Sequence, residues 1–408
     1  MNNYTLLEHM AAGMGNTIAY DTDEKNPGFY VPIEKMTLSQ LLNTDSADVH
    51  PAFTVEGEVL NTVYLGKYNG VLRSSRMYSL PMEEPGYYIT FGDAIRYCAA
   101  KGAGHHMMTL AERALVLLLC KKNGYSPKGN NAGGRDAAEK TMMGIPCTYD
   151  TEGNVRHILE GTGNSEYFHT GNQRGIYGLN GNVCSWIAGY RTVDGEIQII
   201  PDNDAANNVE QGENSTLWRA ILADGTLTEP GTAGTLKWNY LNGVITLDTV
   251  ATAENANHST PFASLAVNTV NLPGGAPLIM KALGLFPDGS DSLAYGGAMF
   301  SVNTGGERMA YAGASYSDGG GSAWSLNGTH ERTYAADTVG VRPAFFSAAN
   351  AGFISLEIDE NGQLVSTAAP ESGFMSFEID ANGQLAYSRA ANVSITFDLE
   401  EGVLIANG

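Results

Sequence analysis

The chain has 408 residues, of which 43% are apolar and 16% charged, so it is long enough for two or three domains and has a globular composition. Its 23 basic and 44 acidic residues leave a formal charge of −21. Nucleic acids and anionic membranes are bound through clustered lysine and arginine, so this balance argues against both as partners. No apolar run reaches the ~18 residues of a membrane-spanning helix, and the first residues do not resemble a secretory signal.

Residues 1–54 are expected to form a separate leader for assembly. This segment has a polar stretch at residues 20–27 and one short helical candidate at residues 36–42. From residue 53 onward, valines and tyrosines separated by glycines predict short strands. The main domain is therefore placed at residues 55–347.

Two helices are predicted with clear start signals. Residues 90–93 and 109–112 each match a capping box, in which two side chains bind backbone N–H groups at the start of a helix. The first helix is predicted to end at Gly102. The second runs to residues 121–122, two lysines that favour the negative end of a helix, and stops at residues 123–124, Asn-Gly.

The chain after the second helix is rich in glycine and asparagine. Strands are predicted at residues 196–200, 216–221 and 243–247, with long irregular segments between them. Loops of this length need a compact scaffold to hold them, and such loops usually carry the function of a domain.

The C-terminal part, residues 348–408, contains a repeat. Residues 353–364, FISLEIDENGQL, recur as FMSFEIDANGQL at residues 374–385, and a looser copy follows at residues 394–404. Each copy is an alternating strand, an Asn-Gly or Glu-Gly pair and a second strand, which predicts a β-hairpin. Three hairpins bury little surface alone, so we expect them to pack on the main domain or on each other in an oligomer.

The sequence contains no recognised motif for catalysis, metal binding or cofactor binding. The four cysteines match no zinc or redox spacing and have apolar neighbours, so we expect them to be buried. They are Cys98, Cys120, Cys147 and Cys184. His105 and His106 would point to opposite faces of a strand, and no nucleophile elbow, phosphate loop or dinucleotide motif is found. These observations favour a binding protein without metal or cofactor over an enzyme.

Three segments of the main domain occur in a recognisable order. They are ITFGDAIRYC at residues 89–98 with MTLAER at residues 108–113, YGLNGNVCSW at residues 177–186, and VGVRPAF at residues 339–345. They resemble the helix pair, the G-N-V-W-E-W segment and the terminal G-F-R-x-A strand of the formylglycine-generating-enzyme (sulfatase-modifying factor) branch of the C-type lectin fold. The resemblance implies an α+β, C-type-lectin-like, loop-rich domain, followed by the small hairpin repeat domain.

The same segments depart from that branch at the positions that carry its chemistry. The enzymes hold copper with a cysteine pair shortly before the final strand, whereas residues 296–346 contain no cysteine. The family's calcium site uses side chains at positions that are Ser185 and Gly178 in this chain. The resemblance therefore implies the fold without the copper chemistry and without this calcium site.

Residues 308–345 look like the variable region of proteins diversified by retroelements, among them phage tropism determinants. Those proteins display a hypermutated ligand-binding face on a C-type lectin fold. Randomised adenines in Asn codons yield Ser, Thr, Tyr, His, Asp, Ala and Gly, but never Lys, Gln, Glu, Met or Trp. Residues 314–338 contain no Lys, Gln or Met, and the resemblance makes Trp324 and Glu331 fixed scaffold positions.

The resemblance places the ligand-binding face near residues 312–338, in two patches. The first patch is Ser315, Tyr316, Ser317 and Asp318. The second patch is Asn327, Thr329, His330, Tyr334, Ala336 and Thr338. Tyrosine and histidine among small polar residues are typical of antibody paratopes, although glycine, serine and threonine are also ordinary loop residues. Arg342, Trp186 and Trp324 are expected to belong to the fold beneath the face.

The function implied is receptor binding at the tip of a phage or prophage tail fibre, in a virion assembled in the bacterial cytoplasm. The partners would be a bacterial surface receptor, either protein or glycan, and other phage tail proteins, with the chain itself a homotrimer. Three alternatives stay open. They are a cell-associated ligand-binding protein of a bacterium, an enzyme of the formylglycine-generating type, and a lectin that binds sugar through calcium.

Overall fold

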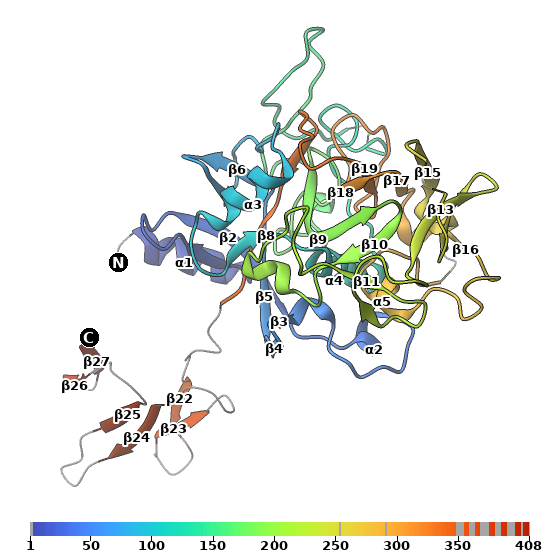
Figure 1. Cartoon of the computed structure of the whole chain (residues 1–408). Coiled ribbons are helices and arrows are strands. Elements are labelled where there is room, and N and C mark those ends of the chain that lie inside the picture. The colour runs from blue at the N-terminus through green and yellow to red at the C-terminus, as the bar shows by residue number, and fades with distance from the viewer. Residues whose placement is uncertain are drawn as a thin grey trace. The chain divides into compact units, whose positions relative to one another are not determined.

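The computed structural model describes residues 3–139, 141–252, 254–289 and 292–347, together with the backbone of six strands beyond residue 354 (Figure 1). The chain divides into two compact units, residues 1–346 and residues 347–408. The first unit combines many strands with a few helices and long loops, so the predicted α+β class is confirmed.

The N-terminal strands belong to a five-stranded sheet in the first unit. Its order is β1 (Thr17–Tyr20), β2 (Pro27–Glu34), β5 (Thr62–Gly66), β21 (Pro343–Phe345) and β8 (His105–Met107). β2 pairs with β5 along its whole length, and Val31 and Ile33 enter the same apolar core as Val63. Residues 1–54 therefore do not form the separate leader that we expected, because their apolar strand completes this sheet and its core.

Both predicted helices are present. α3 (Phe91–Ala99) begins at Thr90, whose hydroxyl accepts the N–H of Asp93, and α4 (Leu110–Lys122) begins with a complete capping box between Thr109 and Glu112. α4 packs against β9, α2 (Leu38–Leu41), which is the predicted short helix, and α5 (Leu278–Ala282). Within the described ranges, no helix is both long and apolar enough to cross a membrane.

A twelve-stranded sheet forms the rest of the first unit. Its main path is β15 (Asn257–Pro261), β17 (Met299–Asn303), β19 (Leu326–His330), β18 (Glu307–Ala312), β9 (Cys184–Val193), β10 (Glu196–Ile199), β13 (Lys237–Leu241), β14 (Val244–Asp248) and β16 (Ala266–Val267). β11 (Arg219–Ile221) joins β10, β12 (Leu227–Thr228) joins β11, and β20 (Val339–Val341) joins β9. The strands predicted at residues 196–200, 216–221 and 243–247 correspond to β10, β11 and β14.

Smaller elements complete the first unit. The remaining strands form two-stranded pairs, β3 (Thr54–Val55) with β4 (Glu58–Val59) and β6 (Gly70–Arg73) with β7 (Arg76–Ser79). The other helices are α1 (Asn3–Gly13), η1 (Pro51–Phe53), η2 (Ser165–Tyr167), η3 (Asp204–Asn207), η4 (Phe262–Ser264) and η5 (Ser292–Tyr295).

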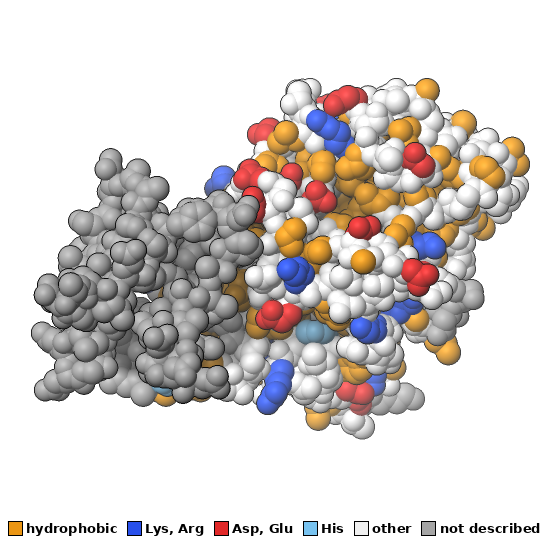
Figure 2. Space-filling model, turned by 90° about the horizontal axis from the view of Figure 1, so that it is seen from below, with side chains coloured by type: hydrophobic (Ala, Val, Ile, Leu, Met, Phe, Trp, Pro, Cys, Tyr) orange, Lys and Arg blue, Asp and Glu red, His pale blue; other side chains and the backbone are white. Residues whose placement is uncertain are grey.

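On the face shown in Figure 2, Lys and Arg side chains lie scattered among Asp and Glu side chains.

The strand order at one end of the large sheet positions the site. A short turn joins β17 to β18, yet β19 lies between them, parallel to β17 and antiparallel to β18. β15 runs antiparallel to β17, with Asn257 opposite Asn303. The start of β15, the ends of β17 and β19, and the start of β18 therefore meet at one edge of the sheet.

The residues expected to belong to the fold are buried. Trp186, Trp324 and Arg342 are at most 2% exposed, which confirms the prediction for all three. Cys98, Cys120 and Cys184 are buried as predicted, whereas Cys147 is half-buried because it lies in a surface loop. The adjacent histidines bind different partners, as their opposite orientations predict: one ring nitrogen of His105 meets the carbonyl of Tyr20, and His106 meets Glu112.

The second unit contains the three predicted hairpins. β22 (Ser355–Ile358) pairs with β23 (Leu364–Thr367), β24 (Met375–Ile379) with β25 (Leu385–Arg389), and β26 (Thr396–Glu400) with β27 (Val403–Asn407), all antiparallel. The predicted Asn-Gly and Glu-Gly turns between the paired strands lie outside the described residues.

Candidate ligand-binding site

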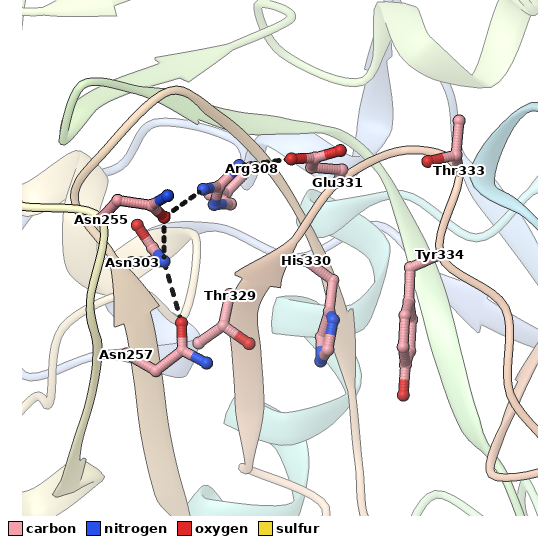
Figure 3. A pocket seen from close by; sticks show the side chains of 9 residues that line it. All are labelled: Asn255, Asn257, Asn303, Arg308, Thr329, His330, Glu331, Thr333 and Tyr334. Atoms are coloured by element: carbon pink, nitrogen blue, oxygen red, sulfur yellow. Dashed lines mark hydrogen bonds and ion pairs between the residues drawn. The ribbon is translucent and has the colours of Figure 1, made fainter.

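An open hollow of about 490 Å³ lies where β15, β17, β18 and β19 meet. The residues that line the hollow are Asn255, Asn257, Asn303, Arg308, Thr329, His330, Glu331, Thr333 and Tyr334 (Figure 3). The lining offers amides, hydroxyls, one guanidinium, one carboxylate and two aromatic rings. Such a wall recognises a ligand by hydrogen bonds and ring contacts more than by burial of apolar surface.

The structure brings together half of the second predicted patch. Thr329, His330 and Tyr334 line the hollow. Asn327, Ala336 and Thr338 are half-buried and do not line it. The carboxamide oxygen of Asn327 accepts a hydrogen bond from the Thr329 hydroxyl at 2.7 Å, so Asn327 supports the wall from outside the hollow.

The first predicted patch does not line the hollow. Ser315 is only 2% exposed, because its N–H and its hydroxyl both bind the carboxylate of Asp318, at 2.5 and 2.9 Å. Ser317 and Asp318 are exposed, and the hydroxyl of Tyr316 donates to the carboxylate of Asp337 at 2.9 Å. Ser315 is therefore placed as a support of its loop, whereas its three neighbours form a separate surface.

A chain of hydrogen bonds orients the amides along one wall of the hollow (Figure 3). The backbone N–H of Gly305 donates to Oδ1 of Asn303 at 2.9 Å, so Nδ2 of Asn303 faces the other way. That Nδ2 donates to Oδ1 of Asn257 at 2.9 Å and to Oδ1 of Asn255 at 3.1 Å. Arg308 donates to the same Asn255 oxygen at 2.9 Å. Because a backbone N–H and a guanidinium can only donate, both ends of the chain determine which way the amides point.

Arg308 supplies the positive charge of the hollow and is 7% exposed. Its Nη1 donates to the backbone carbonyl of Glu307 at 2.9 Å and lies 3.4 Å from the carboxylate of Glu331. Its Nε is buried and has no hydrogen-bond partner among the residues that the structure describes. Glu331, which the resemblance makes a fixed position, lies on the rim with 71% of its side chain exposed, so solvent screens this ion pair.

Two stacked rings form a second wall. The ring centroids of His330 and Tyr334 are 3.6 Å apart at an interplanar angle of 20°, and Tyr311 from β18 lies 5.6 and 6.1 Å from them. Burial and the nearby charge of Arg308 lower the pKa of His330, so its imidazole is neutral at pH 7. The charge of the hollow therefore comes from Arg308 and Glu331.

The loop that carries Tyr334 is held by Arg332. Its guanidinium donates to both oxygens of Glu307, at 2.6 and 2.8 Å, and Arg191 donates to the same carboxylate at 2.8 Å. Burial opposes ionisation of Glu307, but the two arginines outweigh it and lower the pKa of the carboxyl group. Bidentate pairs of this kind fix a side chain in one geometry, so the frame of the hollow is preformed.

A second arginine cluster is completely enclosed in the core. Nη2 of Arg342 donates to Oδ1 of Asn69 at 2.7 Å and to the carbonyl of Gly178 at 2.9 Å. The buried carboxylate of Glu160 accepts from Nδ2 of Asn182 at 2.8 Å and from the backbone N–H of Asn69 at 3.0 Å. A guanidinium thus already supplies the positive charge beside Gly178, one of the two positions at which the resemblance implied that a calcium ligand is missing. In the part of the chain that the structure describes, no three His, Cys, Asp or Glu side chains gather in a way that could hold a metal ion.

Sequence reasoning missed one whole wall of the hollow. The missed residues of this wall are Asn255, Asn257, Asn303 and Arg308, and Thr333 beside Tyr334 was missed as well (Figure 3). The wall residues come from separate segments that meet only because β19 enters between β17 and β18. The one local signal is Arg308, a charged residue at the start of the largely buried strand β18.

Comparison with known proteins identifies no family. No protein-family model matches the chain, and a search of curated proteins finds no match. A fold supports many activities, so the function has to be argued from the site itself.

Proposed function

We propose that this chain is a receptor-binding protein at the tip of a phage or prophage tail fibre. In this proposal a C-type-lectin-like fold of the formylglycine-generating-enzyme type displays a diversified face that binds a bacterial surface receptor, and the chain is not an enzyme. The observation that carries the proposal is the meeting of Thr329, His330 and Tyr334 at an open polar hollow. All three lie in the segment that resembles a variable region.

The side chains that would vary are separate from the buried residues that hold the fold, and this separation supports the proposal. Side chains that would vary, such as His330 and Tyr334, are half-buried and line the open hollow, whereas Trp324 and Arg342 from the same part of the chain are buried. Arg332 ties the backbone of the intervening loop to β18. A face of this kind can change its side chains without loss of the core, which a diversified binding protein requires.

The proposal extends to assembly. The chain would act as a homotrimer in the virion, joined to other tail proteins, because several weak sites on one tip bind a cell surface with higher avidity than one site alone. The hairpin repeats of residues 348–408 are the proposed assembly element. We expect a trimer mass in solution at micromolar concentration, and a monomer mass would contradict this part of the proposal.

A cell-binding assay tests the face directly. Fluorescently labelled full-length chain is titrated onto a panel of bacterial strains, and we expect saturable binding to a subset of them. The double variant His330→Ala, Tyr334→Ala should lower the apparent affinity at least about tenfold, because it removes the ring wall. The matched control is Tyr240→Ala, which removes a similar stack on His258, with centroids 3.8 Å apart, outside the hollow. Equal binding by both variants would contradict the proposal.

Population sequencing tests diversification. We expect substitutions in the source population to gather in codons 314–338 at template adenines, with a near-copy of the segment beside a reverse-transcriptase gene. If these codons vary no more than the rest of the gene, the diversified face is wrong.

A further inference from the structure

The amide wall of the hollow presents donors to a ligand. Its internal hydrogen bonds occupy Oδ1 of Asn303, Asn257 and Asn255. The Nδ2 groups of Asn255 and Asn257, both exposed residues, face away from this chain of bonds as available donors. The guanidinium of Arg308 completes the set and can only donate. The complement of such a wall is a group that only accepts hydrogen bonds.

The charge of the hollow also favours a ligand group that only accepts hydrogen bonds. Arg308 is 7% exposed, and the carboxylate nearest to it belongs to Glu331, whose side chain is 71% exposed on the rim. The imidazole of His330 is neutral, so it does not compete for an anion. A buried guanidinium with a solvent-screened partner is incompletely compensated. A carboxylate that entered the hollow would meet Arg308 on the inside and displace Glu331.

The lining favours a saccharide over a peptide as the carrier of that carboxylate. Apolar anchor side chains and strand addition hold many peptides, whereas this hollow is lined by amide, hydroxyl, charged and aromatic side chains. Arginine also binds acidic peptide motifs, so hexaglutamate is included in the test below. Amides and hydroxyls such as Thr333 match the hydroxyl groups of a sugar. The volume of about 490 Å³ lies within the range of small-molecule sites.

We infer that the hollow binds an acidic saccharide, whose carboxylate pairs with Arg308 in place of Glu331 and whose other oxygen atoms accept hydrogen bonds from Asn255 and Asn257. This inference rests on the proposed binding function and names the ligand class of that same site. Glu331 is then a built-in competitor, and its removal should strengthen binding while removal of Arg308 weakens it.

The test titrates the full-length chain with sodium glucuronate and sodium galacturonate, and with the methyl esters of both, by ligand-observed NMR. We expect the acids to bind at least tenfold more tightly than their neutral esters, because only the acids pair with Arg308. Glu331→Gln should raise the affinity for the acids two- to fivefold, and Arg308→Gln should lower it at least tenfold.

The chain offers a close control for the charge change. Outside the hollow, Glu229 lies 3.4 Å from Arg219 with 72% of its side chain exposed, which matches the distance and the carboxylate exposure of the Arg308–Glu331 pair. Glu229→Gln should therefore leave the affinity for uronates unchanged. Thermal unfolding of each variant shows whether it is still folded, above all for Arg308→Gln. The tighter uronate binding expected of Glu331→Gln cannot be explained by a loss of folded protein.

Three results would overturn the inference. They are equal affinity for acids and esters, weaker binding by Glu331→Gln, and tighter binding of hexaglutamate than of the uronates, which would make the site one for acidic peptides. The cell-binding assay separates this failure from that of the proposed function. Cell binding that depends on His330 and Tyr334 but is unaffected by uronates refutes the saccharide alone, whereas absence of both kinds of binding refutes the proposed function.

Discussion

Two clusters of arginine, asparagine and glutamate in this chain have the same composition and opposite settings. Around Arg342 in the core, the guanidinium and the Glu160 carboxylate are buried and hydrogen-bonded to amides and carbonyls. Around Arg308 in the hollow, two amide donors and the Glu331 carboxylate face solvent. A buried polar network is stabilising only when every member is satisfied, whereas an open one keeps the capacity to bind. Burial from solvent, more than residue type, distinguishes the structural cluster around Arg342 from the binding cluster around Arg308.

The largest expected effect is on the closed cluster. Arg342→Met leaves four buried oxygen atoms without their donor, among them the carbonyls of Gly66 and Gly178, and removes the positive charge near the buried Glu160. The free energy of unfolding should therefore fall by about 3–5 kcal/mol. Arg308→Met, at the open cluster, should cost about 1 kcal/mol, because Glu331 stays solvated. Urea unfolding of both variants measures the difference. Equal losses would mean that the two clusters play the same structural role.

The buried histidines extend the comparison to pH. Burial lowers the pKa of His50 to about 4 and that of His105 to about 3, whereas histidines in the unfolded chain titrate near 6.5. Below pH 6.5 the unfolded state takes up protons that the folded state excludes, so the folded state loses stability as the pH falls. We expect a loss of about 2 kcal/mol per histidine between pH 7 and pH 5.

Urea unfolding at the two pH values measures this loss. Nδ1 of His50 accepts the N–H of Ala52, which requires an unprotonated nitrogen. The variant His50→Gln should therefore remove the His50 contribution to the pH dependence, whereas the half-buried His330 of the hollow should contribute less. A pH dependence unchanged by His50→Gln would refute the explanation.

An intermediate effect on stability is expected for Arg332, which holds the loop that carries Tyr334. Arg332→Met removes the bidentate pair with Glu307 and frees the loop that carries Tyr334, so cell binding should weaken about five- to tenfold. The free energy of unfolding should fall by only about 1–1.5 kcal/mol. Arg332→Lys should restore stability better than binding, because a lysine cannot form the paired contact. Proportional recovery of both would argue that Arg332 does not position the loop.

The smallest expected effect tests whether the two predicted patches are independent. Tyr316→Phe removes the hydrogen bond to Asp337 outside the hollow, at a cost of about 0.5–1 kcal/mol in stability. Uronate binding should be unchanged, since Tyr316 does not line the hollow. A loss of uronate affinity in this variant would show that the two patches act as one surface.

Short-range patterns in the sequence predict a good part of this molecule. The Thr90 cap of α3, the capping box of α4 and the alternating strands of the three hairpins involve residues within a few positions of one another, so neighbouring residues are enough to specify them. The burial of Arg342, Trp186 and Trp324 followed from their motifs. The prediction for residues 1–54 was wrong because pairing of β2 with β5 depends on a partner strand that local composition does not reveal.

The hollow could not be predicted in the same way. Its residues come from β15, β17, β18 and β19 and from the loops before β15 and after β19. They meet because β19 enters between two strands that a short turn would otherwise pair directly. The direction of each amide depends on donors at both ends of a hydrogen-bond chain, Gly305 and Arg308, which no spacing rule connects. Local chemistry thus specified the helices, the hairpins and half of the second predicted patch. Long-range strand order decided which side chains surround the ligand, because contacts between distant segments exist only once the sheet has formed.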